Sequence, residues 1–287
     1  MKNILILGKG YVGTHVASTL KGHQHRVLHV SRSEMDYHEP GILQACIKNK
    51  RVNVVINCSG YTGFPNVDAC ERLENQTICQ QLNAHIPFLI ENEVDQTDAK
   101  FIHVGSGCIY TGYDKQYTEE DEPNFGLSNS ESSFYSQTKH MAEKLLNTDK
   151  TCVLRIRMPI DSLPSQKNYL SKLLKYDNLI DYVNSKTDLT MLGDLMSVIA
   201  EDFEPGIFNV VHDNPLTTRE VLDIMESYNI VNKNWNIVDI DKLDIIAPRS
   251  NCVLSNSKVK RFYGFKPGPE SYYIKLCCSI LARALNC

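Results

Sequence analysis

The start of the chain places three glycines directly after a short apolar run. Residues 4–7 (ILIL) have the composition of a buried strand, and Gly8, Gly10 and Gly13 follow them as G-x-G-x-x-G. Residues 11–20 then carry apolar side chains at helical spacing. A strand that turns through glycines into a helix is the first unit of a parallel sheet with helical crossovers, so it restricts the fold class to α/β.

The rest of the chain repeats this alternation of strand and helix. Apolar runs predict further strands at 26–30, 52–56, 100–104, 152–156 and 206–211. Helical patterns lie near 40–50, 66–83, 84–93 and 134–146. We therefore predict a doubly wound parallel sheet, a Rossmann domain, over residues 1–158. Residues 159–287 are expected to form mainly a smaller substrate-binding lobe, from which about 186–211 return to the sheet.

Composition and charge exclude several classes of protein. The 287 residues carry 30 basic and 34 acidic side chains without a basic cluster, which argues against nucleic acid as a partner. The apolar runs are shorter than the roughly 18 residues that cross a bilayer, and glycines end the first run before a signal-peptide core forms. We expect a cytoplasmic protein without membrane contact. The ten cysteines lack any C-x-x-C pair, so we expect reduced thiols and no metal site.

The glycine turn predicts a dinucleotide cofactor. Glycines permit a tight turn, and the N–H groups at the start of the helix can then approach a pyrophosphate at its positive end. The expected binding residues are Gly8, Gly10, Tyr11, Val12 and Gly13. A purely structural turn is the alternative.

The end of the second strand bears on the type of cofactor. Ser31 and Arg32 stand where an acidic residue would accept from a ribose 2′-OH, and Arg32 can pair with a 2′-phosphate. This favours NADPH, with NADH as the alternative. Asp36 is either a partner of the adenine amino group or an exposed carboxylate at a helix start. The loop after the strand at 52–56 is expected on the nicotinamide side, through Asn57, Ser59 and Gly60.

A Y-x3-K pair indicates catalysis. On a helix this spacing puts Tyr135 and Lys139 on one face, where the ammonium can support proton donation by the phenol. The spacing also arises by chance, as Tyr182 and Lys186 show in an Asn/Ser-rich loop, to which we assign no catalysis. The first pair begins a predicted helix after a strand that ends near Ser106. We expect the Ser106 hydroxyl to hydrogen-bond a substrate carbonyl beside Tyr135.

Together these features resemble the extended short-chain dehydrogenase/reductase family over nearly the whole chain. More specific stretches are similar to the nucleotide-rhamnose synthase/epimerase-reductase family, which corresponds to the C-terminal part of plant rhamnose synthase. The stretches are residues 61–71 (YTGFPNVDACE), 107–110 (GCIY), 122–125 (EPNF), 134–139 (FYSQTK), 155–160 (RIRMPI) and 246–251 (IAPRSN). The family's usual glycine loop is G-x-x-G-x-x-G, and here it is one residue shorter.

The resemblance implies conversion of UDP-4-keto-6-deoxy-glucose to UDP-L-rhamnose, by epimerisation at C3 and C5 and NADPH-dependent reduction at C4. In that chemistry Tyr135 protonates the C4 oxygen, Lys139 anchors the nicotinamide ribose, and Ser106 orients the ketone. Cys108 lies two residues beyond Ser106, on the same side of an extended strand end, and a thiol can act as base and acid near neutrality. By resemblance its partner is Lys172. Which of the two is the base and which the acid stays open, and structural roles are the alternatives.

The resemblance also implies substrate contacts and partners. Arg249 is expected to pair with the nucleotide diphosphate, Asn83 to brace the site from its helix, and Asn251 to lie on the substrate side. A separate 4,6-dehydratase is expected to supply the substrate, and a homodimer through the helix of Tyr135 is possible.

Three other functions stay open. A dTDP-4-keto-rhamnose reductase without epimerase activity would not need Cys108 and Lys172. An enzyme like GDP-fucose synthase would share the cysteine but not the stretches PNVDACE and APRSN. A non-catalytic regulatory subunit would keep NADP binding alone.

Overall fold

A parallel sheet of six strands forms the centre of the computed structural model, which describes residues 1–230 and 233–285. The strand order is β10-β6-β4-β3-β1-β2, and every neighbouring pair is parallel. The strands are β1 (Asn3–Leu7), β2 (Arg26–Val30), β3 (Val54–Asn57), β4 (Lys100–Ser106), β6 (Thr151–Ile156) and β10 (Gly206–Val210). The predicted doubly wound α/β fold is therefore confirmed.

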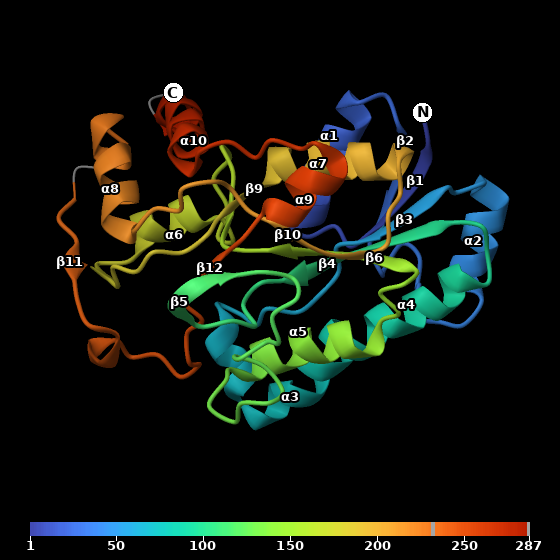
Figure 1. The fold of residues 1–287 in the computed structure, drawn as a ribbon, viewed down its shortest axis with the longest axis horizontal. Coiled ribbons are helices and arrows are strands. Elements are labelled where there is room, and N and C mark those ends of the chain that lie inside the picture. The colour runs from blue at the N-terminus through green and yellow to red at the C-terminus, as the bar shows by residue number, and fades with distance from the viewer. Residues whose placement is uncertain (231–232, 286–287) are drawn as a thin grey trace.

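Helices cover both faces of the sheet (Figure 1). One face carries α1 (Tyr11–Gly22), α7 (Leu189–Glu201) and α9 (Ser257–Tyr263). The other face carries α2 (Ile42–Lys50), α4 (Ile86–Asp95) and α5 (Phe134–Leu145). Alternate residues of β1 serve the two faces, because Ile4 and Ile6 pack in the first core whereas Leu5 and Leu7 pack in the second. Burial on both faces explains why these strands are continuously apolar.

The direction of chain progression reverses at β1, which pairs with β2 on one side and β3 on the other. The carboxyl ends of β1 and β3 are consequently adjacent. Gly8 has a φ of +100°, and a Cβ there would lie 2.9 Å from the backbone of Ser59. A Cβ on Gly13 would lie 2.0 Å from the Gly8 carbonyl oxygen. These approaches exclude any side chain at either position, at the switch point where open α/β sheets bind ligands.

The chain between β3 and α4 differs from the predicted helices at 66–83 and 84–93. It forms the 3-10 helix η1 (Val67–Glu71), then α3 (Leu73–Gln80), and then the π-helical turn η2 (Gln81–His85), which leads directly into α4. Arg72 separates the first two with an extended backbone (φ −71°, ψ 130°). From the sequence, the apolar pattern predicts helix throughout this segment. Neither the extended residue Arg72 nor the inserted π turn changes the spacing of the apolar residues enough to be recognised.

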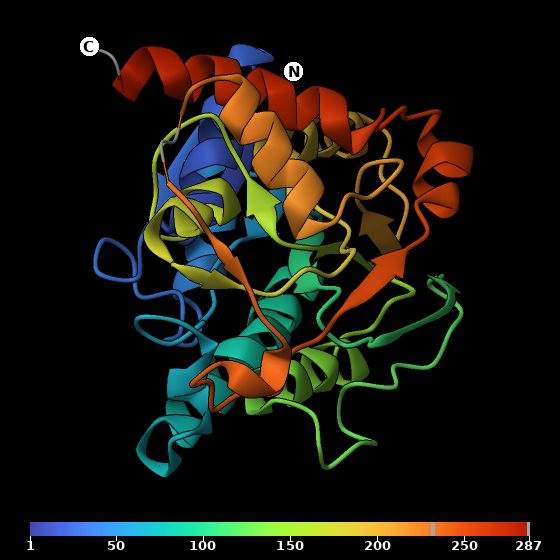
Figure 2. The same ribbon diagram turned by 90° about the vertical axis from the view of Figure 1, so that its left-hand side faces the viewer.

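A second lobe lies over the carboxyl ends of the strands. Its apolar core joins α6 (Tyr169–Lys175), α8 (Thr218–Ser227) and α10 (Glu270–Leu285), and Figure 2 shows α8 and α10 side by side. Its short strand pairs are β7 (Pro159–Ile160) with β9 (Thr187–Asp188), and β8 (Asn178–Leu179) with β11 (Asn236–Ile237). A further pair, β5 (Gly112–Tyr117) with β12 (Cys252–Leu254), lies beside the lobe, and η3 spans Ile240–Lys242. No helix within the described ranges combines the length and apolarity needed to cross a membrane.

Candidate active site

Ser106, Tyr135 and Lys139 meet at the carboxyl end of β4. Ser106 is the last residue of β4, and α5 begins at 134 because Ser133 caps it, with Oγ accepting from the Ser136 N–H at 3.1 Å. The Ser106 hydroxyl lies close enough to the Tyr135 phenol to affect its pKa. Lys139 Nζ lies 5.9 Å from the centre of the Tyr135 ring. The structure thus brings together the three residues expected to carry out the reduction.

Burial sets the protonation of this group. It raises the pKa of the Tyr135 hydroxyl, and the neighbouring Ser106 hydroxyl opposes the shift without cancelling it. Burial also lowers the pKa of Lys139, which is 7% exposed. Tyr135 therefore keeps its proton at neutral pH and is available as a proton donor.

Asn83 lies in the π turn and is completely buried. Its Oδ1 accepts from the Tyr61 N–H at 2.7 Å, and its Nδ2 donates to the Tyr61 carbonyl at 2.8 Å and to Thr138 Oγ1 at 3.1 Å. Its amide therefore holds the loop after β3 against α5. Asn83 braces the site as expected, but it is enclosed by protein and is not placed to contact substrate directly. A Cβ on Gly60 would lie 3.2 Å from Asn83 Oδ1 and 3.4 Å from Lys139 Nζ.

A buried network of hydrogen-bonding side chains also fixes the loop after β3. Asn57 Oδ1 accepts from the N–H of Ser59 at 3.0 Å and from its hydroxyl at 2.6 Å. The Asn57 amide also contacts His103 Nδ1 at 3.2 Å. Burial lowers the pKa of His103 well below its usual value, so the ring is neutral. The sequence analysis missed His103, although a histidine within an apolar strand was a visible signal.

The amino end of α1 fits a pyrophosphate. No side chain caps the helix and its first turn has no acidic residue, so its leading N–H groups face outward without an anion. A Cβ added to Gly10 would have no atom within 4 Å, which shows open space at this helix end. The loop is shaped by hydrogen bonds from Gly8 N–H to the Val30 carbonyl at 2.9 Å and between the Gly8 carbonyl and His29 Nε2 at 3.1 Å. Tyr11 and Val12 are the first residues of the helix.

Several hydrogen-bond donors that could bind an anion lie close together at the end of β2. The N–H and hydroxyl of Ser31 lie 2.8 and 3.0 Å from the Glu34 carboxylate, and Lys9 Nζ lies 2.5 Å from it. The hydrogen bond from Lys9, with those from Ser31, lowers the pKa of Glu34 to about 2. The Arg32 side chain is 61% exposed, with Nε 4.0 Å from Asp36 Oδ1. The sequence analysis predicted Ser31, Arg32 and Asp36 here but missed Lys9 and Glu34.

Cys108 and Lys172 also converge on this site. Cys108 is half-buried just beyond β4, and its N–H donates to Ser106 Oγ at 3.2 Å. Burial lowers the pKa of Lys172, and so does the charge of Lys167, whereas the nearby Cys108 sulfur acts in the opposite direction. The predicted acid-base pair is therefore close enough to interact electrostatically, from two different lobes.

Arg249 and Asn251 join the two lobes. Arg249 Nη1 forms an ion pair with Asp68 Oδ1 at 2.8 Å and also donates to the Ala247 carbonyl at 2.9 Å. Burial opposes ionisation of Asp68, but the Arg249 and backbone hydrogen bonds prevail and its pKa is lowered. Asn251 Oδ1 accepts from Asn184 Nδ2 at 2.9 Å. Both residues have protein partners, and their predicted substrate contacts remain predictions.

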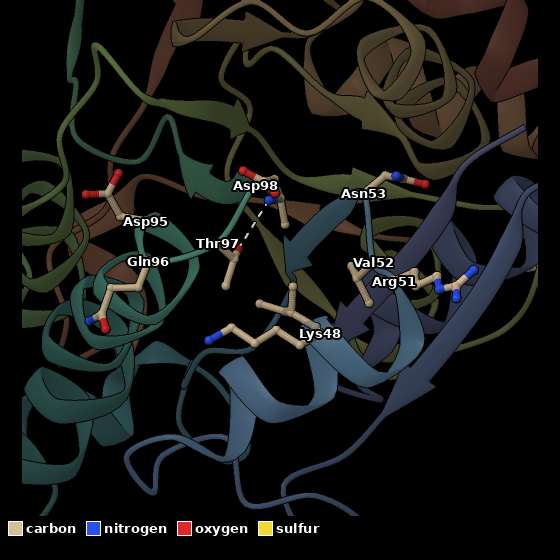
Figure 3. Close-up of a pocket in the computed structure, with 10 residues that line it drawn as sticks. Lys48, Arg51, Val52, Asn53, Asp95, Gln96, Thr97 and Asp98 are labelled. Carbon is tan, nitrogen blue, oxygen red and sulfur yellow. Dashed lines mark hydrogen bonds between the residues drawn. The ribbon is translucent and has the colours of Figure 1, made fainter.

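Two features lie outside this site. The second Y-x3-K pair is structural, because Lys186 is buried in an ion pair with Glu270, with Nζ and Oε1 2.7 Å apart. A cleft of about 670 Å³ lies at the amino ends of β3 and β4, the opposite edge of the sheet (Figure 3). Its lining includes Lys48, Arg51 and Asp95 and none of the catalytic candidates.

The fold and the Ser106, Tyr135 and Lys139 group define a Rossmann-fold protein of the short-chain dehydrogenase/reductase class. A family model described as the RmlD substrate binding domain matches residues 1–278. The chain belongs to this family.

Curated relatives support the assignment, and solved structures share the fold. A bifunctional dTDP-4-dehydrorhamnose 3,5-epimerase/reductase of Arabidopsis thaliana is 33% identical over 229 residues, covering 75% of this chain and 73% of that protein. A trifunctional 4,6-dehydratase/3,5-epimerase/reductase of the same plant is 31% identical over 81% of this chain, which spans only 35% of its length. The structure of UDP-rhamnose synthase from Acanthamoeba polyphaga mimivirus has a TM-score of 0.88 and 23% identity, over 97% of this chain and 99% of that one. A dTDP-4-dehydrorhamnose reductase of Bacillus anthracis in complex with NADP has a TM-score of 0.81 and 16% identity, covering 96% of each chain.

Proposed function

We propose that this protein is a nucleotide-sugar 4-ketoreductase of rhamnose synthesis that also epimerises C3 and C5 of its substrate, UDP-4-keto-6-deoxy-glucose. The relatives named above support the reductase, and both of the plant enzymes carry the epimerase activity in their names. The observation that carries the proposal is the position of Cys108, which lies beside Ser106 and Tyr135 and is near Lys172 of the second lobe.

A dinucleotide fits the glycine loop, and NADPH fits the donors at the end of β2. Gly8, Gly10 and the first N–H groups of α1 would hold the pyrophosphate, and Ser31, Arg32 and Lys9 would hold a 2′-phosphate. When bound, reduced nicotinamide supplies a hydride to the substrate carbonyl carbon.

The residues of this chain supply the proton and the orientation for the reduction. The Ser106 hydroxyl fixes the C4 oxygen, and Tyr135, held in its protonated form by burial, gives its proton to that oxygen. Lys139 lies beside the Tyr135 ring, where its ammonium stabilises the tyrosinate that remains.

Epimerisation uses the same hold on the C4 oxygen. A C–H bond next to the ketone loses its proton to a base, and the electron pair moves into an enolate whose oxygen is stabilised by Ser106 and Tyr135. An acid then returns a proton to the carbon from the opposite side. Cys108 and Lys172 supply the base and the acid, and exchange with water restores their starting protonation. The product of the two epimerisations stays in the site for reduction at C4.

The substrate requires a 4,6-dehydratase, and we propose that another active site supplies it. The trifunctional plant relative is consistent with this, because its name includes a dehydratase and this chain spans about a third of its length. We also propose a homodimer through α5 and its neighbouring helices. The exposed apolar side chains Leu73, Ile78, Leu89 and Leu145 on α3, α4 and α5 support it.

The test is NADPH oxidation by the purified protein. With UDP-4-keto-6-deoxy-glucose as the sole sugar, the proposal predicts oxidation of NADPH and formation of UDP-rhamnose. Oxidation only with a 4-keto sugar that has already been epimerised would reduce the function to a reductase. No oxidation with either sugar, despite NADPH binding, would favour a regulatory subunit.

A further inference from the structure

Arg157 is a buried cation in contact with Cys108. It follows the last residue of β6 and is 1% exposed. Its Nη1 lies 3.4 Å from Cys108 Sγ, 3.5 Å from the Gly107 carbonyl and 2.6 Å from Ser250 Oγ. Its Nη2 donates to the Ser250 carbonyl at 3.2 Å and to Asn184 Oδ1. Three of the stretches that resemble the rhamnose-synthase family, 107–110, 155–160 and 246–251, therefore meet at this guanidinium.

The acceptors of Arg157 include no carboxylate. Within residues 1–230 and 233–285, no acidic side chain forms an ion pair with it, and its Nε has no partner. A buried charge without a counter-ion costs several kcal/mol, so the fold is expected to place an ionisable acceptor beside it. Cys108 is the ionisable group that accepts a hydrogen bond from Arg157.

Cys252 is the other thiol near Arg157, but among the described residues the guanidinium donates to the sulfur of Cys108 and not to that of Cys252. The Cys252 Sγ donates to the Gly107 carbonyl at 3.9 Å, which requires the protonated thiol. It is completely buried, and burial raises the pKa of Cys252. Cys252 is consequently a matched control for Cys108.

The remaining groups around Cys108 also favour an anion. The titratable groups that face it are Tyr135 and Lys139 on α5, Arg157 after β6, Lys172 on α6 and Cys252 on β12. Three of these are cations when protonated, and none is a carboxylate. Such electropositive, partly exposed surroundings are the ones in which protein thiolates occur.

We propose that Arg157 is a positioning residue that holds Cys108 as a thiolate, which makes Cys108 the base and Lys172 the acid of the epimerisation. The assignment of Cys108 as base and Lys172 as acid rests on the proposed function. The ionisation of Cys108 beside Arg157 does not depend on that function. The thiolate takes the proton from the sugar carbon and becomes a thiol, and the Lys172 ammonium gives a proton to the opposite face and becomes an amine. Burial, which lowers the pKa of Lys172, makes its ammonium a better proton donor.

The thiolate is tested by alkylation of the whole protein with iodoacetamide, followed peptide by peptide with mass spectrometry. Cys46 on α2 is an internal reference, because it is also half-buried and burial raises its pKa. We expect the alkylation rate of Cys108 to persist to lower pH than that of Cys46. If the alkylation rates of Cys108 and Cys46 depend on pH in the same way in the unaltered protein, the proposal is wrong. This comparison needs no variant.

Variants then assign the effect to Arg157. In Arg157→Gln the Cys108 profile is expected to move toward that of Cys46, and Arg157→Lys is expected to recover most of the original profile. If Arg157 served only in folding, the Cys108 profile would not depend on whether residue 157 carries a positive charge. Cys252→Ala is expected to leave the Cys108 profile unchanged. An unchanged profile in folded Arg157→Gln, or a profile that moves with Cys252→Ala, would overturn the assignment.

Proton exchange separates this inference from the proposed function. If Cys108 is a thiolate that depends on Arg157 but UDP-4-keto-6-deoxy-glucose gains no deuterium in D2O, the epimerase function fails and the thiolate stands. If the sugar exchanges while Cys108 behaves like Cys46, the function stands and the role of Arg157 is refuted.

Discussion

The surroundings of Tyr135 raise the pKa of its phenol above the ordinary value of about 10. Burial is the main cause of this shift, the Ser106 hydroxyl lies near the phenol, and Lys139 lies on the same face of α5. The second Y-x3-K pair has the same spacing, but its lysine is engaged in a buried ion pair with Glu270. Because the two pairs share the same spacing, the difference between them comes from where each pair lies in the fold.

Tyr135→Phe is expected to lower the rate of 4-keto reduction by about 10²- to 10⁴-fold, because the proton donor is removed. NADPH binding should be kept, since the phenol is not part of the glycine loop. The matched control is Tyr182→Phe, which alters a ring that stacks on Tyr113 and should leave the rate unchanged. Steady-state rates and binding titrations check both variants. Full activity in Tyr135→Phe would show that another group donates the proton.

Cofactor preference is predicted to depend on two residues with opposite effects. Arg32→Ala should weaken NADPH binding by about tenfold and change NADH binding little, because the guanidinium pairs only with a 2′-phosphate. Glu34→Gln should tighten NADPH binding by about fivefold or less, because its carboxylate occupies the Ser31 and Lys9 donors that the phosphate would use. Fluorescence titrations with both cofactors measure these changes. Equal effects on NADPH and NADH would contradict a 2′-phosphate site at the end of β2.

At the residue scale, the grouping of the site residues could be predicted only in part from sequence. Ser106, Tyr135, Lys139 and Cys108 were found because motif spacing and strand ends place them, and the structure brings them together. Arg157 was missed as a functional residue because a charged residue after a buried strand has no motif of its own. Its significance depends on Cys108 and Ser250, which are distant in sequence from it and from each other.

At the scale of elements, the strand–turn–helix unit at the start of the chain depends on close backbone contacts. β1, the glycine loop and α1 pack so that Gly13 touches the Gly8 carbonyl. This unit was predictable because both its apolar run and its glycines are local signals. The π turn before α4 was not, because one additional residue in a helical turn leaves the apolar pattern nearly unchanged, yet that turn places Asn83 against Tyr61.

Gly13→Ala is expected to destabilise the protein by about 2 kcal/mol or more and to abolish cofactor binding, because its Cβ would lie 2.0 Å from the Gly8 carbonyl oxygen. Gly22→Ala, in the last turn of the same helix, meets no atom within 4 Å and should leave stability unchanged or slightly higher. Chemical denaturation and NADPH titration measure the two effects. Tight NADPH binding by Gly13→Ala would contradict the loop geometry.

At the scale of the whole molecule, ion pairs join segments that are far apart in sequence, one pair completely buried and one half-buried. The buried pair is Lys186 with Glu270, and the half-buried pair is Arg249 with Asp68. His212 follows β10 and lies against Tyr273 of α10, with ring centres 4.1 Å apart. Its Nδ1 lies 2.9 Å from the Pro267 carbonyl and its Nε2 accepts from the Asp188 N–H at 3.3 Å, an arrangement that requires the neutral ring.

His212 predicts a loss of stability in acid. Burial lowers its pKa from 6.5 to about 4, so its contribution is complete above pH 6.5 and is lost as the pH falls toward 4. By about pH 5 the loss from this residue is about 2 kcal/mol. Urea unfolding measures the free energy of unfolding at about pH 7.5 and at about pH 5. Between these two pH values, His212→Gln should lose about 2 kcal/mol less of this free energy than the unaltered protein loses. The same loss in both proteins would show that His212 does not titrate as described.

The proposed function requires the two lobes to bring acid-base and reducing chemistry to one site, and proton NMR in D2O tests this most directly. The purified protein is mixed with UDP-4-keto-6-deoxy-glucose, first without and then with NADPH. The account predicts deuterium at C3 and C5 before NADPH is added, and UDP-rhamnose deuterated at both positions afterwards. Reduction without prior deuterium incorporation at either carbon would contradict the epimerase function of Cys108 and Lys172.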